Sequence, residues 1–226
     1  MNPGPMLRAA GVGPQGYDSP APRSGPDYRR RPGIDSAAAS IALWLFMIVA
    51  STLFLLFLTA YAMRMNAGDW SPLAMPWQLW LSTLLLAGGS VLLHFATQAA
   101  RAAHLSTART LLLAGGACVC VFLGVQWWGW QALLTIHVTA AGNPAGSFFY
   151  LLTAMHGLHV VGGLVAWART ARGAWRYTAA VDAAQVAWRI ALCARYWHFL
   201  LALWIVLFAA LGWLTPDLVR LVCGIR

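Results

Sequence analysis

Five long apolar segments dominate the pattern of hydrophobic and polar positions along the chain. Each has more than 20 residues and almost no charge. At 1.5 Å per residue, that length crosses a hydrocarbon layer about 30 Å thick. Backbone groups in hydrocarbon must find their hydrogen bonds within the segment, so each run is predicted to be a helix. The predicted spans are 37–63, 77–100, 110–134, 147–171 and 192–214. The sequence therefore predicts an all-α fold, a polytopic bundle of five transmembrane helices.

Residues 1–36, ahead of the first span, differ from the rest of the chain in composition. They hold seven of the eleven prolines and the run Arg29-Arg30-Arg31. A segment this poor in apolar side chains cannot offset its ordering entropy, so it is predicted to be disordered. Its first 30 residues also lack the apolar stretch of a cleavable signal peptide. We therefore divide the chain into a Pro/Gly/Arg-rich cytoplasmic tail, 1–36, and a five-helix transmembrane domain, 37–226.

Composition agrees with a membrane protein and argues against two other classes. Hydrophobic residues make up 60% of the 226 residues and charged residues 9%, whereas soluble domains carry about 25% charge. The formal net charge of +9 would suit a nucleic-acid binder. The arginines, however, flank apolar runs and are not interleaved with aromatic residues. We therefore expect neither a soluble fold nor a nucleic-acid partner.

The arginines also predict an orientation. With the N-terminus inside, twelve of the fifteen fall in the tail, the second and fourth connections or the start of the last span. Only Arg64, Arg220 and Arg226 fall on the other side. Because basic residues collect on the cytoplasmic side of membrane proteins, the predicted topology is N-in, C-out.

No carboxylate falls within a predicted span. The six acidic residues are all Asp and lie in the tail or the connections, at positions 18, 27, 35, 69, 182 and 217. Proton pumps and ion-coupled transporters normally keep an ionisable carboxylate at membrane depth. The pattern therefore argues against independent proton or cation transport by this chain.

Histidine is the remaining candidate for chemistry, with His94, His156, His159 and His198 inside spans. His156 and His159 lie three residues apart and so share one helix face with Thr153. This pair is interpreted either as metal or haem ligands, or as a polar cluster that fixes helix packing or contacts lipid or a neighbouring subunit. Two histidines on one turn cannot sandwich a haem, so the second interpretation is favoured.

Small residues inside the spans have a similar pair of interpretations. The pairs Gly88-Gly89, Gly115-Gly116 and Gly162-Gly163 are typical of close helix contacts in membranes. Ser90, after the first pair, weakly resembles the nucleophile of an intramembrane serine protease, with His156 or His198 as base. The glycine which that family places after its serine is missing, so packing is favoured. The four cysteines form no CxxC motif and are expected to be small apolar residues.

Two sequence blocks carry a family resemblance. The stretch 148–163 contains the pattern Thr-x-x-His-Gly-x-His-x-x-x-Gly, from Thr153 to Gly163, and the last span contains Tyr196-Trp197-His198-Phe199 followed by Trp204. Together, in this order and separation, they resemble subunit III of the haem-copper (cytochrome c) oxidases in its five-helix bacterial form. Weaker similarities extend the resemblance over about residues 40–213.

The chain departs from that family at three acidic positions. The glutamate of the first helix corresponds to Ala50, the glutamate of the third to Gly129, and the aspartate of the final block to Leu201. All three positions are uncharged here. The chain is therefore interpreted as a divergent member.

The resemblance implies a non-catalytic accessory subunit of a respiratory oxidase in a bacterial inner membrane. It implies no catalytic, metal or cofactor site in this chain, with haem and copper held by partner subunits. The implied partners are the catalytic subunit I, other oxidase subunits and phospholipid. The residues implied to make structural, subunit or lipid contacts are Thr153, His156, His159, Tyr196, Trp197 and His198.

Two alternatives remain open at this point. A related subunit could accompany a nitric oxide reductase, which would suit the missing acidic residues. A stand-alone haem-binding membrane cytochrome would use the histidines as ligands. The sequence does not distinguish cytochrome c from quinol as the electron donor of the complex.

Overall fold

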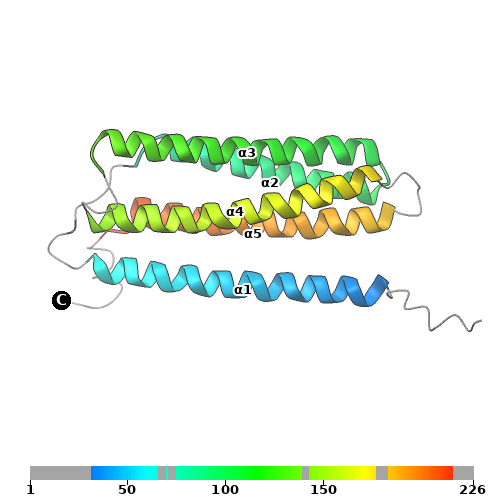
Figure 1. Cartoon of the computed structure of the whole chain (residues 1–226), viewed down its shortest axis with the longest axis horizontal. Coiled ribbons are helices and arrows are strands. Elements are labelled where there is room, and N and C mark those ends of the chain that lie inside the picture. The colour runs from blue at the N-terminus through cyan, green and yellow to red at the C-terminus, as the bar shows by residue number, and fades with distance from the viewer. Residues whose placement is uncertain (1–31, 66–69, 71–74, 139–142, 177–182, 216–226) are drawn as a thin grey trace, which may run out of the picture.

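The chain is a bundle of five long helices (Figure 1). The computed structural model describes residues 32–65, 70, 75–138, 143–176 and 183–215. The helices are α1 (Pro32–Arg64), α2 (Gln78–Arg101), α3 (Leu105–Thr135), α4 (Pro144–Arg176) and α5 (Ala183–Trp213). Each is long and apolar enough to cross a membrane. The predicted all-α fold of five spans is confirmed.

The helices extend beyond the predicted spans. α1 begins at Pro32, inside the segment assigned to the tail, and α5 begins at Ala183 instead of residue 192. Hydropathy marks only the part of a helix that needs hydrocarbon, and polar or basic turns can continue it at either end. α1 and α4 both begin with proline, whose missing N–H is unpaired in a first helical turn anyway. The rest of the predicted tail, residues 1–31, lies outside the described residues.

α2 and α3 form a tight antiparallel hairpin. Three residues, 102–104, connect them, and Ala103 takes a positive φ of 59° to turn the chain. Further along, the two backbones approach closely, because a Cβ added at Gly89 would lie 3.2 Å from the carbonyl oxygen of Gly115. Small residues thus allow the helix contact that the glycine pairs predicted.

The other helices pack around this hairpin to different depths. α5 contacts α2, α4 and α1, and α4 also contacts α3. α1 lies on the outside against α4 and α5, at the opposite side of the bundle from α3 (Figure 1). Within the apolar stretch of each helix, 50% of α5 is buried but only 17% of α1. α5 is therefore the central helix and α1 the peripheral one.

Tryptophan side chains join neighbouring helices by hydrogen bonds. Trp204 on α5 donates through Nε1 to Thr83 Oγ1 on α2 at 2.9 Å. Trp167 on α4 donates to the carbonyl oxygen of Leu112 on α3 at 2.8 Å. Since lipid tails remove the hydrophobic gain of helix association, such bonds and close packing specify which helix faces meet.

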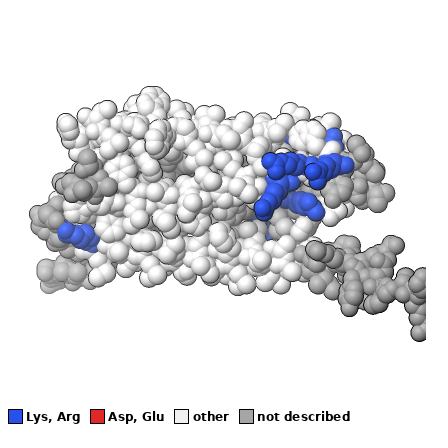
Figure 2. Space-filling model, viewed as in Figure 1, with Lys and Arg blue, Asp and Glu red and all other residues white. Residues whose placement is uncertain are grey.

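Charge is strongly asymmetric along the bundle. Among the described residues, Arg101, Arg109, Arg172, Arg176 and Arg189 lie at helix ends on the side where α1 begins, and Arg64 lies at the other end. Figure 2 shows a group of basic side chains at one end and a single one at the other.

Candidate functional site: the intramembrane histidines

The residues singled out from the sequence do not form one cluster. Thr153, His156 and Trp197 lie in the interior of the bundle and are 4%, 0% and 1% exposed. His159 and Tyr196 lie where α4 and α5 meet α1. His198 is exposed on the surface of α5. The six residues therefore occupy an interior layer, a seam and an outer face.

His156 is fully buried and packs against two aromatic side chains. Its ring lies 5.1 Å from the Trp204 ring and 6.1 Å from the Phe122 ring, between centroids. Neither ring nitrogen has a hydrogen-bond partner among the described residues. An unpaired buried polar group costs about 1–3 kcal/mol. An apolar side chain of similar size at position 156 would avoid this loss of folding free energy.

Thr153, one turn before His156, is fully engaged. Its hydroxyl donates to the carbonyl oxygen of Phe149 at 2.6 Å and accepts from Nε1 of Trp130 on α3 at 3.2 Å. The first bond satisfies the hydroxyl within its own helix, and the second ties α4 to α3. The role of Thr153 in this geometry is helix packing.

His159 satisfies one ring nitrogen within its own helix. Nδ1 lies 2.7 Å from the carbonyl oxygen of Met155. Because a carbonyl only accepts, the proton of this hydrogen bond is on Nδ1. The ring packs against Phe46 and Phe54 of α1, at centroid distances of 5.8 and 5.4 Å. His159 thus faces the peripheral helix.

Ala50 occupies the same face of α1 as those two phenylalanines. It lies four residues from each of them and is 3% exposed, and residues four apart on a helix share a face. By the family resemblance this position would hold a glutamate. Ala50 therefore lies on the α1 face that packs against His159, and its methyl side chain adds no charge to this contact.

Tyr196 and Trp197 hold α5 against α4. The Tyr196 hydroxyl donates to the carbonyl oxygen of His159 at 3.0 Å. A Cβ added at Gly163 would lie 2.9 Å from Tyr196 Cε1 and 3.1 Å from Trp197 Cζ2. At the adjacent Gly162 a Cβ would meet nothing within 4 Å. Only the second glycine of this pair is needed for the contact between α4 and α5.

His198, on α5, contacts a different set of polar side chains, which lie on α2. Its Nδ1 is hydrogen-bonded to Ser90 Oγ, and its ring centroid lies 5.9 Å from that of His94. The Gln98 amide donates through Nε2 to Nε2 of His94 at 2.9 Å. Ser90, His94 and Gln98 repeat every four residues and so line one face of α2.

The bond between Ser90 and His198 joins the two residue types that a serine protease would use. Ser90 is only 3% exposed, so a substrate carbonyl has no access to its hydroxyl. Nucleophilic serine sites also orient the base through a third group, whereas the described contacts of the His198 ring are with Ser90 and His94. The geometry therefore favours packing, as the sequence pattern did.

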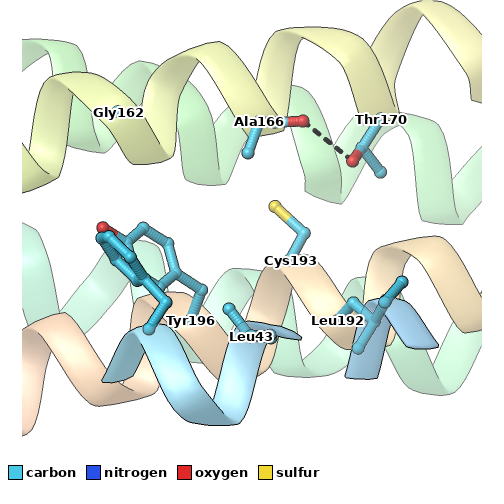
Figure 3. Close-up of a pocket in the computed structure, with 9 residues that line it drawn as sticks. Leu43, Gly162, Ala166, Thr170, Leu192, Cys193 and Tyr196 are labelled. Atoms are coloured by element: carbon cyan, nitrogen blue, oxygen red, sulfur yellow. Dashed lines mark hydrogen bonds between the residues drawn. The ribbon is translucent and has the colours of Figure 1, made fainter. Parts of the chain in front are cut away.

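An open cavity of about 390 Å³ lies between α1, α4 and α5, beside their contact (Figure 3). Gly162, Ala166 and Thr170 line its α4 side at four-residue intervals, and Cys193 and Tyr196 lie on the α5 side. The Thr170 hydroxyl donates to the carbonyl oxygen of Ala166 at 2.9 Å, so it offers little to a ligand. The lining is almost entirely apolar, which suits a hydrocarbon chain.

The other two acidic positions of the family are also accommodated without charge. Gly129 is buried, and a Cβ there would lie 3.6 Å from Gln78 Cβ. Leu201 packs against the central hydrophobic core. In the described part of the chain, no three histidine, cysteine or acidic residues are grouped as metal ligands.

Together the fold and these positions define a class: a multi-pass membrane protein whose polar residues mainly join helices. No family model matches the chain. A protein of Mycobacterium leprae named as a probable cytochrome c oxidase subunit 3 is 37% identical over 90 residues, 38% of this chain and 41% of the relative. Cytochrome c oxidase subunit 3 of Thermostichus vulcanus is 28% identical over 184 residues, 77% of this chain and 87% of the relative.

A third relative, a probable cytochrome c oxidase subunit 3 of Mycobacterium bovis, is 40% identical over 83 residues, 34% of this chain and 37% of the relative. The chain thus matches about two fifths of the length of the mycobacterial relatives, but most of the Thermostichus protein. The chain is thus similar to cytochrome c oxidase subunit 3 proteins over one long, weaker match and several shorter, stronger ones.

The sequence anticipates the connection between α2 and α5 only in part. The weak protease resemblance pairs Ser90 with His156 or His198, without a choice between the two, and does not include Gln98. A usable signal was present, since Ser90, His94 and Gln98 recur every four residues in an otherwise apolar span. Such spacing predicts a polar stripe on one helix face, although not which helix it meets.

Proposed function

We propose that this chain is the non-catalytic subunit III of a haem-copper terminal oxidase, where it supports assembly, lipid binding and sustained turnover. The similarity to Thermostichus subunit 3 carries the proposal, because it covers 77% of the chain. Haem and copper belong to partner subunits in this proposal. The burial of His156 against two aromatic side chains agrees with a packing residue better than with a ligand.

The proposed partners are the catalytic subunit I, other oxidase subunits and phospholipid. The apolar cavity between α1 and α4–α5 is the place we assign to a lipid acyl chain. The proposed location is the bacterial inner membrane, with the N-terminus inside. The arginines at one end of the bundle support this orientation, since basic residues favour the cytoplasmic side.

The six candidate residues take different roles within this proposal. Thr153, His156 and Trp197 set the packing of α3, α4 and α5. His159 and Tyr196 form the seam to α1, and Tyr196 also lines the lipid cavity. His198 is assigned to the contact with a neighbouring subunit. Replacing them is expected to loosen assembly or shorten the working life of the oxidase, with intrinsic electron transfer largely intact.

The test is an affinity purification in mild detergent through a tag on the N-terminal tail, with mass spectrometry and a visible spectrum. The expected result is that a large multi-helix haem protein co-purifies with this chain. After the chain has been separated from that partner, it is expected to carry no haem. The identity of that partner distinguishes an oxygen-reducing oxidase from a nitric oxide reductase. An isolated chain that carries haem by itself would overturn the proposal and make the histidines ligands.

The His156→Ala variant tests separately whether His156 binds haem. The His156→Ala complex is expected to keep its haem spectrum, because His156 contacts only side chains of its own bundle. Its activity is expected to decay faster during turnover than that of the unchanged complex. Loss of haem from the variant at the outset would contradict the assignment of His156 to packing.

A further inference from the structure

The outer face of α5 is not covered by the rest of the bundle. Arg195, His198 and Ala202 are exposed there, followed by Ile205 and Val206, which are 50% and 52% exposed. These positions recur every three or four residues and so form one stripe along the helix. α1 and α2 both contact α5 and flank this stripe.

Two hollows lie along the stripe and share Arg195. One, of about 480 Å³, lies against α1 and is lined by Trp44, Ser51 and His198 among others. The second, of about 580 Å³, lies against the end of α2 and is lined by Arg101 and Trp188. We call the stripe and its two hollows the α5 groove. Its floor is α5, and its walls are α1 and α2.

The α2 wall of the groove carries polar side chains deep into the membrane. Ser90 lies eleven residues before Arg101, the last residue of α2, or about 16 Å along the helix axis. That distance reaches the middle of a hydrocarbon layer about 30 Å thick. His94 and Gln98 lie between the two and are exposed, and His198 is exposed beside Ser90.

These side chains have hydrogen-bonding capacity left after their bonds within the chain. The Gln98 amide donates to Nε2 of His94, so the proton of that ring is on Nδ1. His198 uses Nδ1 for Ser90, which leaves its Nε2. Exposing such groups to hydrocarbon is costly, and polar residues at this depth face protein or water. An acyl chain offers them no partner.

The charge of the groove further restricts its occupant. Arg101 and Arg195 are the charged residues among those that line the two hollows. A lipid phosphate at the membrane surface could pair with the arginines but could not reach His198 or Ser90. A transmembrane helix could meet both sets of groups. A carboxylate near the membrane surface would pair with the arginines, and acceptor groups deeper in the membrane would bond to the histidines and Gln98.

We propose that the α5 groove docks a transmembrane helix of the catalytic subunit, through acidic and hydrogen-bonding side chains that meet Arg101, Arg195, His94, Gln98 and His198. The inference rests on the proposed function and adds the face at which the partner binds. It leaves the exposed face of α3, with Ala117 and Val121, free of the catalytic subunit.

The test places a photo-crosslinking amino acid at Ala202, in the groove, or at Ala117, on the exposed face of α3, in intact membranes. Both positions are exposed alanines in the middle of a helix, so they form a matched pair. The expected result is a crosslink from position 202, but not from 117, to the haem-bearing catalytic subunit identified by mass spectrometry. A crosslink from 117 alone, to a second copy of this chain, or to lipid only would overturn the inference.

Variants measure the same interface quantitatively. Ala202→Trp is expected to lower the catalytic subunit recovered per molecule of this chain at least fivefold, while Ala117→Trp leaves it unchanged. The double variant His94→Leu, His198→Leu is expected to lower it by roughly three- to tenfold, the range for losing one or two membrane hydrogen bonds. Equal recovery for the two tryptophan variants would contradict the inference.

The two proposals fail in distinguishable ways. If purification of the unchanged chain recovers the oxidase and position 202 does not crosslink to it, the groove assignment is wrong and the subunit assignment stands. If the unchanged chain recovers no haem protein and position 202 crosslinks to none, the proposed function fails, and the groove assignment fails with it.

Discussion

Three histidines within the helices differ in how their ring nitrogens are hydrogen-bonded. His159 donates to a carbonyl oxygen of its own helix, and His198 bonds to Ser90 on a neighbouring helix. His156 has no partner among the described residues. Because an unpaired buried group costs about 1–3 kcal/mol, His156 is the residue at which the bundle is least well satisfied.

This difference predicts opposite effects of two substitutions at His156. His156→Leu is expected to raise the free energy of unfolding of the isolated chain by about 1 kcal/mol, since it removes two unpaired polar atoms and keeps the volume filled. His156→Ala is expected to lower it by about 2–4 kcal/mol, because it leaves a cavity between Trp204 and Phe122. Denaturant titration in mixed micelles measures both values. A clear loss of stability in the leucine variant would mean that the imidazole has a partner in the isolated protein.

At the scale of the element, α1 stands apart from the other four helices. Its apolar residues are spread around the helix and are not gathered on one face, and its contacts are with α4 and α5. Phe54 anchors it, since this side chain is 1% exposed and packs with Leu152 and Leu207. The apolar cavity beside it reduces the contact further. α1 is therefore the helix whose attachment depends on the fewest side chains.

Adjacent residues on α1 provide a direct test of that attachment. Phe54→Ala is expected to destabilise the docked helix by about 3 kcal/mol, the usual cost of truncating a buried aromatic side chain. Leu55→Ala is expected to change stability by less than about 0.5 kcal/mol, since Leu55 is 65% exposed. Hydrogen exchange of the α1 amides in detergent, compared with those of α5, reports the effect. Similar exchange in the two variants would contradict an anchoring role for Phe54.

At the scale of the whole molecule, the distribution of arginine predicts the orientation in the membrane. A fluorescent protein fused to the N-terminus is expected to fluoresce, and alkaline phosphatase fused to the C-terminus to be active, because each works on only one side of the inner membrane. The physical reason is the retention of basic segments on the cytoplasmic side. Exchanging the two reporters provides the control. Activity only in the exchanged pair would show the opposite orientation and contradict the prediction.

The sequence by itself determined the number, order and type of the elements. Apolar runs such as 37–63 and 110–134 force helices wherever they meet hydrocarbon, and this requirement is local to each run. The helix ends were less well predicted, and α5 begins nine residues before the predicted span, since hydropathy does not register the turns outside the hydrocarbon. The family resemblance also came from local blocks of sequence, around His156 and His198.

Only the tertiary structure decided which polar residues meet. Ser90 and His198 are 108 residues apart in the chain, and the six candidate residues separate into an interior layer, a seam and an outer face. It also decided that Gly163 supports a helix contact while Gly162 faces open space. The physical reason is that helices surrounded by lipid gain little from burying apolar surface. Their rotation and pairing therefore depend on shape and on a few hydrogen bonds, which form between residues far apart in sequence.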